Sequence, residues 1–283
     1  MRRDVLDNIN PTAALVYFAV VICAAVILFH PLASALSLAA ALAYGSWLRG
    51  ARSMKYFFGF AVPIGLITVA VNALFVHRGL TVWFYLGDAQ ITWEAVIYGG
   101  CAALMIAAVL MWFYDMSVVM TSDKFIYVFG RILPSASLMF SMTMRFVPCF
   151  VSRAGQIAQA RRALGCSDGE KVRGGLKTVS VMTTWALENS IDTADSMKAR
   201  GYGRPGRSCY RAYGWRGGDI VFLAAAAVLG FLVFASGISF QCYPRVQHSG
   251  DLIGFMALAA LCAAPVILDA REEIIWMYSK SKI

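Results

Sequence analysis

The chain has 283 residues, of which 59% are hydrophobic and only 14% are charged, and its mean hydropathy is +0.65. In a soluble domain about a quarter of the residues are charged. This composition excludes an ordinary soluble enzyme. Because long uncharged stretches alternate with short stretches that hold nearly every Lys and Arg, we predict an all-α polytopic membrane protein.

Six uncharged windows are long enough to cross a hydrocarbon core as helices. They are residues 13–29, 32–48, 58–75, 95–112, 220–240 and 252–268. None of them contains Asp, Glu, Lys or Arg, so we expect no ionisable side chain at membrane depth. The first two windows are separated only by His30-Pro31, which leaves either a tight hairpin or one broken element, and we favour the hairpin.

The basic residues are distributed unequally between alternate sides of these spans. If the N-terminus is cytoplasmic, 23 of the 25 Lys and Arg residues fall inside, and only Arg78 and Arg245 fall in the outer loops near 76–94 and 241–251. Positively charged loops are retained on the cytoplasmic side of a membrane. The opening segment MRRDVLDNINP lacks the features of a cleaved signal peptide, so we expect it to be retained. We therefore predict a multi-pass protein of a prokaryotic cell membrane, with both termini in the cytoplasm.

The same pattern divides the chain into three segments. Residues 1–122 hold four spans, residues 123–217 form a cytoplasmic or interfacial insert, and residues 218–283 hold the last two spans. The insert contains fifteen basic and six acidic residues, a net charge of +9 that equals the formal charge of the whole chain. Each basic side chain near an anionic membrane contributes about 1 kcal/mol to lipid binding, so membrane lipids are expected partners. No stacking-aromatic motif accompanies the charge, which makes nucleic acid a poor partner.

Glycine and proline divide the insert into two or three amphipathic helices. The apolar stretch 134–150 contains Pro148, near which we expect a helix to end. The stretch 151–164 then runs in good helix-forming order until Gly165. A last helical pattern reaches from 170 to the glycines that begin at Gly201.

Sequence patterns for enzyme chemistry fail when they are inspected in context. The segment GYGRPG at 201–206 follows a helix rather than a strand, and GEKVRGGLKT at 169–178 has Lys177-Thr178 two residues too late for a phosphate-binding loop. The seven cysteines and three histidines are scattered. We therefore predict no catalytic residues, no metal site and no cofactor bound by this chain.

Two alternative functions remain open from composition and spacing alone. An autonomous carrier or channel needs polar groups at membrane depth, where Asn72 is the only amide. A membrane enzyme acting on a phosphorylated lipid needs converging carboxylates, and Asp192 with Asp195 could share a helix face. The nearby cations Lys198 and Arg200 make a salt-bridged helix surface the plainer interpretation of those two acids.

Four short motifs occur in an order that is specific. They are Asn72-Ala73-Leu74-Phe75 with Gly79, Arg145-Phe146-Val147-Pro148, Trp185-Ala186-Leu187-Glu188-Asn189, and the stretch from Ala194 to Gly203 that contains Ala199-Arg200-Gly201. With these motifs the chain resembles the transmembrane T component of energy-coupling factor (ECF) transporters. This is the family of EcfT and CbiQ proteins in prokaryotic vitamin and metal uptake.

The resemblance implies a non-catalytic scaffold subunit of an ATP-driven importer. Two coupling helices would contact two ABC-type ATPase subunits, the A and A' components, which carry ATP and Mg. The membrane part would hold a small substrate-binding S component, which selects the vitamin, other micronutrient or metal ion.

The resemblance also assigns residues to two surfaces. Ala199, Arg200 and Gly201 match one ATPase-coupling signature. The other signature departs from the family pattern, because Ala163-Leu164-Gly165 lacks the central arginine, which either Arg161 or Arg162 replaces. The surface that transmits motion to the S component would comprise Met139, Met142, Met144, Arg145, Phe146 and Pro148.

Overall fold

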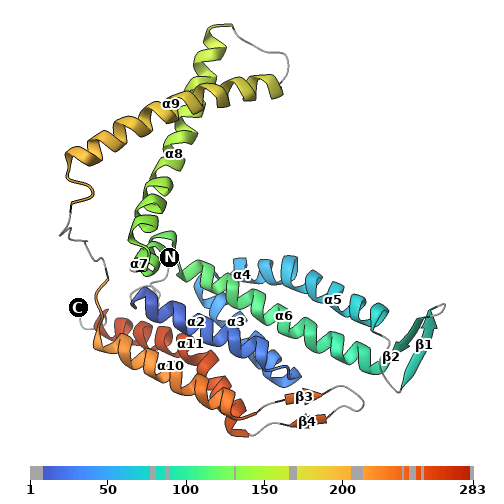
Figure 1. Ribbon diagram of the computed structural model, residues 1–283. Helices are drawn as coiled ribbons and strands as arrows, with labels where there is room; N and C mark the ends of the chain where they lie inside the picture. Colours follow the sequence, from blue (N-terminus) through green and yellow to red (C-terminus); the bar gives the residue numbers. More distant parts are fainter. Residues whose placement is uncertain are drawn as a thin grey trace. The chain divides into compact units, whose positions relative to one another are not determined.

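A computed structural model describes residues 9–76, 81–86, 89–130, 132–165, 171–204, 213–237, 239–241, 247–249 and 252–280. The chain forms two compact units (Figure 1). The first, here called the membrane unit, combines Met1–Phe125 with Tyr213–Ile283. The second, the insert unit, is Ile126–Ala212. The boundaries that the sequence predicts for the insert, 123 and 217, lie within a few residues of those of the insert unit.

The membrane unit is built from apolar helices. They are α2 (Pro11–Ile27), α3 (Pro31–Arg49), α4 (Ala51–Tyr56) continuing through a π-helical turn η1 (Phe57–Ala61) into α5 (Val62–Phe75), α6 (Trp93–Val119), α10 (Gly217–Ala235) and α11 (Leu252–Lys280). Five stretches are long and apolar enough to cross a membrane, and α2 is a shorter apolar helix of the same kind. Each of the six predicted windows therefore contains an apolar helix, although the window 220–240 extends five residues beyond the end of α10 at Ala235. The predicted all-α polytopic membrane fold is confirmed.

Local capping explains why the first two spans are separate helices. The Asn10 side chain accepts a hydrogen bond from the Thr12 backbone N–H at 3.1 Å, and proline follows it at the first position of α2. His30 repeats this arrangement, since its Nδ1 accepts from the Leu32 N–H at 3.2 Å before α3 begins at Pro31. A side-chain acceptor followed by proline at the first helical position is a strong helix start. Residues 28–30 therefore separate two independently started helices.

Helix α6 lies at the centre of the membrane unit and packs against α2, α3 and α5. The Trp112 side chain is fully buried and donates from Nε1 to the Ser37 hydroxyl at 3.0 Å. Gly99 brings α6 close to α5, because a β-carbon there would lie 3.1 Å from Cβ of Asn72. The Asn72 side chain donates to the Thr68 carbonyl within its own helix at 3.0 Å. The polar groups of this interface are thus engaged in hydrogen bonds that stabilise the helices, as packing in an apolar medium requires.

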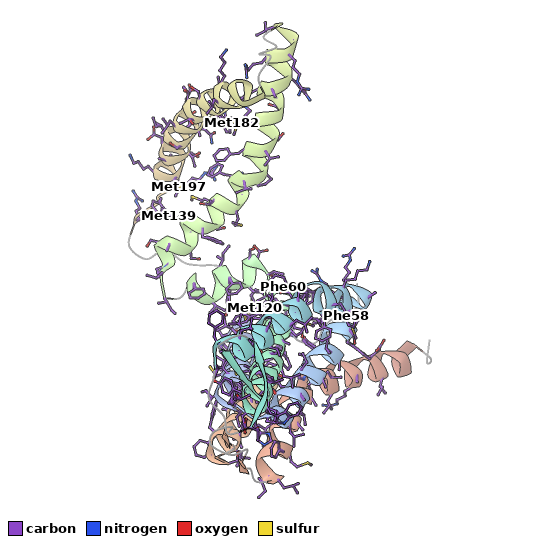
Figure 2. The ribbon with its side chains drawn as sticks, turned by 90° about the vertical axis from the view of Figure 1, so that its right-hand side faces the viewer. Phe58, Phe60, Met120, Met139, Met182 and Met197 are labelled. Atoms are coloured by element: carbon purple, nitrogen blue, oxygen red, sulfur yellow. The ribbon has the colours of Figure 1, made fainter. Side chains whose placement is uncertain are left out.

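The helix 51–75 is the most exposed of the five long spans, with 11% of its apolar window buried within the chain. Phe58 and Phe60, labelled in Figure 2, are 66% and 47% exposed. At the end of η1 the Val62 N–H bonds to the Phe57 carbonyl five residues earlier. The π-helical turn therefore lies directly before Pro63, which has no N–H to donate.

Two short antiparallel hairpins occur at or next to the segments where the sequence predicts outer loops, and the first two residues of β3 (Ser239–Gln241) fall within the predicted window 220–240. Strand β1 (Val82–Leu86) pairs with β2 (Ala89–Thr92), and β3 (Ser239–Gln241) pairs with β4 (Gln247–Ser249). These strands contain only three to five residues, so a hydropathy window as long as a membrane span does not detect them. The hairpins add to the helical fold and do not alter it.

The insert unit contains the last five residues of α7 (Ser122–Gly130) and two long helices, α8 (Pro134–Ala163) and α9 (Lys171–Ala199). Figure 1 shows α9 crossing α8. The expectation that a helix ends near Pro148 is wrong, because α8 continues through it for fifteen further residues. A proline removes one backbone hydrogen bond, and the Ala-, Gln- and Arg-rich sequence that follows has enough helix propensity to continue the helix.

Candidate coupling surface

Helix α9 ends in a complete glycine cap at the second predicted signature. Gly201 has φ +83°, and its N–H bonds to the Lys198 carbonyl at 2.9 Å while the Tyr202 N–H bonds to the Met197 carbonyl at 3.0 Å. This pair of bonds defines the Schellman motif, which requires a residue that tolerates positive φ directly after the helix. Arg200 is the capping residue itself and is exposed. The Ala-Arg-Gly sequence therefore presents an arginine at a rigid helix end.

Helix α8 ends in a closely similar way at the first predicted signature. Gly165 has φ +71° and its N–H bonds to the Arg162 carbonyl at 3.1 Å. Leu164 occupies the capping position that Arg200 holds in α9, and 78% of it is exposed. The two helix ends therefore match in backbone geometry and differ in the side chain that they present, apolar at one end and cationic at the other.

The structure distinguishes between the two arginines that precede this cap. Arg161 is half-buried, and its Nη1 donates hydrogen bonds to the Gly174 carbonyl and, at 3.2 Å, to the Thr178 hydroxyl of α9. Arg162 is exposed, and its side chain forms no hydrogen bond or ion pair with the residues that the structure describes. Arg161 thus connects α8 to α9, and Arg162 is the arginine that a partner can reach.

The exposed charges beside Arg200 interact weakly with one another. The Lys198 ammonium lies 3.9 Å from Asp195 Oδ1, with about three quarters of each side chain exposed. Exposed pairs of this kind contribute between 0 and 1 kcal/mol. Among the described residues no three His, Cys, Asp or Glu side chains are grouped so that they could hold a metal ion.

An apolar groove of about 250 Å³ runs between α8 and α9. Its lining comprises Met142, Phe146 and Phe150 from α8 and Ala186, Asn189, Ser190, Thr193, Ala194 and Met197 from α9. The α8 residues are spaced four apart, so they form one stripe along that helix. The groove is thus formed by facing stripes of the two helices.

Aromatic contacts extend from the groove along the crossing of α8 and α9. The rings of Phe146 and Phe150 stack with centroids 5.9 Å apart, and Phe150 meets Trp185 edge-on at 5.7 Å. The Arg153 guanidinium lies 5.2 Å from the centroid of the Trp185 ring, within cation–π range. These contacts, together with those of Arg161, hold the two helices together from the middle of α8 to its end.

The predicted transmission residues divide between the groove and the open surface. Met142 and Phe146 line the groove. Met139 and Met144 are 68% and 41% exposed, and Arg145 and Pro148 are exposed as well. Figure 2 labels Met139 on α8 and Met197 on α9.

The sequence analysis missed the α9 half of the groove and Leu164. The spacing of Ala186, Ser190, Ala194 and Met197 by three or four residues would have identified one helical face. Nothing in the sequence alone indicates that this face lies opposite Met142 and Phe146.

A comparison with known proteins identifies the family to which this chain belongs. Residues 2–209 match the sequence profile of CbiQ, described as a cobalt transport protein. That match covers most of the chain. The chain belongs to the CbiQ family. This CbiQ-family chain contains both helix ends and the groove within the matched region.

Curated relatives carry a consistent description. The chain is 28% identical over 187 residues to the energy-coupling factor transporter transmembrane protein EcfT of Listeria innocua. The aligned region covers 60% of this chain and 69% of that protein. The chain is 31% identical over 104 residues to the EcfT protein of Bacillus subtilis, covering 35% of this chain and 39% of that protein. The matches therefore extend over about two fifths to two thirds of these relatives. They support a transmembrane component of an ECF transporter.

Proposed function

We propose that this chain is the scaffold subunit of an ECF-type importer, which couples ATP hydrolysis by two cytoplasmic ATPase subunits to uptake through a small membrane S component. The observation that carries the proposal is the pair of glycine-capped helix ends, at Gly165 and Gly201, in a family of transporter membrane proteins. Each end offers an exposed side chain on a fixed backbone. A rigid end of this kind is suited to fit a groove on a partner, because little conformational entropy is lost on binding.

The two ends are expected to contact the ATPases by different chemistry. Arg200 presents a planar cation that can bind carboxylates or backbone carbonyls through two hydrogen bonds. At the other end the exposed Leu164 can enter an apolar pocket of the partner. Arg162, two residues earlier in the chain, supplies a positive charge beside it. The two ATPase subunits then meet unequal surfaces, so a heterodimeric ATPase pair fits this chain better than two identical subunits.

Motion of the ATPases would reach the membrane through the α8–α9 crossing. The Arg161 and Trp185 contacts hold the two helices near the α8 end, whereas the groove leaves them separated around Met142 and Met197. A change in the separation of the capped ends would therefore be converted into a change in the groove. Methionine side chains suit such a surface because they repack against different partners. In this proposal the S component contacts the exposed α8 face around Met139 and Met144.

ATP and Mg are assigned to the partner subunits, and this chain supplies no catalytic group. The choice of vitamin, other micronutrient or metal ion lies with the S component. The proposal also places the insert unit and both termini in the cytoplasm, in agreement with the distribution of basic residues.

Affinity purification tests the proposal. The tagged chain is extracted from its host membrane with a mild detergent, and the co-purified proteins are identified by mass spectrometry. We expect two ATP-binding subunits and at least one small membrane protein with the wild type, and at least ten-fold less of the ATPases with Arg200→Ala. The matched control is Lys198→Ala, which removes the same charge two residues away at an exposed position.

The same assay tests the end of α8. Arg162→Ala is expected to deplete the ATPases, and Leu164→Asp more strongly so. Recovery of the chain without ATP-binding proteins, in conditions that keep a known importer intact, would refute the proposal and restore the carrier and membrane-enzyme alternatives.

A further inference from the structure

A buried carboxyl group without a partner lies near the end of α6. Asp115 is 0% exposed, and within the described part of the chain neither of its carboxyl oxygens has a hydrogen-bond partner. It forms no ion pair with any described residue either. Asp115 lies three residues beyond the predicted uncharged window 95–112. The predicted window stops at residue 112, whereas the apolar helix continues to Val119.

A second unpartnered polar group lies beside Asp115. Ser53, on α4, is 0% exposed, and its hydroxyl has no hydrogen-bond partner among the residues with a described structure. A β-carbon placed on Gly45 of α3 would come within 3.0 Å of both the Ser53 hydroxyl oxygen and Asp115 Oδ1. Both oxygens therefore lie against the same glycine, and three helices meet at one small polar site.

The described surroundings of Asp115 offer no compensating positive charge. Helices α2 and α3 pack against α6, and α4 contacts it through the stacked rings of Tyr56 and Tyr114. These three helices carry the titratable or charged side chains Tyr17, Cys23, Tyr44, Arg49, Arg52, Lys55 and Tyr56. The three cations among them, Arg49, Arg52 and Lys55, are exposed. Tyr17 lies close enough to interact electrostatically with Asp115, but its hydroxyl donates to the Leu261 carbonyl at 2.9 Å. Beyond α6, the Lys124 ammonium donates to the Val119 carbonyl at 3.0 Å.

An ionised carboxylate in this environment is strongly disfavoured. Removing a charge from water without a partner costs several kcal/mol even after the protein relaxes. The neutral acid avoids this cost and also gains a donor, because a protonated carboxyl group carries one O–H. A bound proton therefore gives Asp115 a donor, and the Ser53 hydroxyl oxygen, which lies against the same glycine, can accept its hydrogen bond.

We propose that Asp115 and Ser53 form a proton-binding site in the membrane unit. One proton adds to the Asp115 carboxylate, and the resulting O–H donates to the Ser53 hydroxyl oxygen, which ties α6 to the start of α4 beside Gly45. Loss of the proton returns it to water and leaves a buried anion, which destabilises this junction of α3, α4 and α6. The site is independent of the coupling surface and of the proposed ATPase partners.

Infrared spectroscopy and thermal unfolding of the purified full chain test the site. In the difference spectrum between wild type and Asp115→Asn at pH 7, we expect the carbonyl band of a protonated carboxylic acid. Asn imitates the neutral acid, so the Tm of Asp115→Asn is expected to remain within about 2 °C of the wild type at pH 7. At higher pH, the wild type is expected to lose Tm relative to Asp115→Asn, because only the wild type can release the proton.

A matched control is available on α10. Asp219 is also buried, but its Oδ2 accepts a hydrogen bond from the Arg216 N–H at 3.0 Å, at a helix start. Asp219→Asn removes an anion from a helix N-terminus and is expected to lower the Tm at pH 7. A second variant, Ser53→Ala, is expected to shift the carboxylic band of Asp115 by removing its acceptor, whatever its effect on stability.

Two outcomes would overturn the proposal. The first is a missing carboxylic band combined with a loss of Tm in Asp115→Asn as large as in Asp219→Asn, which would mean that Asp115 is ionised. The second is a wild-type Tm that rises with Na⁺ or K⁺ but not with choline and loses this dependence in Asp115→Asn. That result would assign the site to a metal cation.

Discussion

Replacing Arg161 with Ala removes the two hydrogen bonds that connect the end of α8 to the start of α9. Hydrogen bonds from a charged donor each contribute about 1.5–3 kcal/mol when buried. Because Arg161 is half-buried and both bonds come from one guanidinium nitrogen, we take about 2 kcal/mol for the pair. At about 1.4 kcal/mol per factor of ten, local opening of this part of the hairpin should become roughly thirty-fold more frequent.

Hydrogen–deuterium exchange of the purified chain measures this opening directly. In Arg161→Ala, the amides of residues 174–182 should exchange roughly thirty-fold faster, since exchange reports the free energy of local opening. Arg161→Lys keeps one donor and should lie between that variant and the wild type. Arg162→Ala should exchange at the wild-type rate, because the Arg162 side chain has no hydrogen bond or ion pair to lose among the described residues.

This comparison tests whether Arg161 joins the two helices while Arg162 remains accessible to a partner. Equal exchange in wild type and Arg161→Ala would refute the assignment of Arg161 as the residue that joins the helices. An increase of the same size in Arg162→Ala would also refute it, since a general loss of basic charge would then explain both variants.

Three further substitutions test the packing described above. Trp112→Phe removes the hydrogen bond to Ser37 and leaves that hydroxyl buried, so the free energy of unfolding should fall by about 1–2 kcal/mol; an unchanged Tm would contradict this. Gly45→Ala introduces a methyl group within 3.0 Å of oxygens on Ser53 and Asp115 and should cost about 1–3 kcal/mol by the same measurement, whereas a tolerated alanine would argue against the close approach. Gly201→Ala forces alanine to φ +83° and should destabilise the end of α9 by about 1 kcal/mol, seen as faster amide exchange over residues 196–200; equal protection would mean that the cap is absent.

The spans and the helix ends could be predicted because each depends on local sequence. Uncharged windows of sufficient length are enough to identify a helix in a membrane, since no other element satisfies its own backbone there. Gly165 and Gly201 mark helix ends because the cap needs positive φ. The position of Ala163-Leu164-Gly165 as the counterpart of Ala199-Arg200-Gly201 follows from the same rule.

Other features depend on contacts between residues that are distant in the sequence. The continuation of α8 through Pro148 reflects the balance between one lost hydrogen bond and the propensity of the whole helix. The different environments of Arg161 and Arg162 arise only when α9 folds back on α8. The burial of Asp115 likewise depends on α3 and α4, and the sequence around it gives no sign that both oxygens lack a partner.

Site-specific photo-cross-linking tests the central claim most directly. A photoreactive amino acid is placed at position 162 or 200, and at position 187 as a control, because Leu187 is 63% exposed in the middle of α9. Irradiation of native membranes should join positions 162 and 200 to ATP-binding subunits and leave position 187 without these products. ATPase cross-links that are absent at both helix ends, or equally strong at position 187, would contradict the proposal that the capped ends of α8 and α9 couple this chain to ATP hydrolysis.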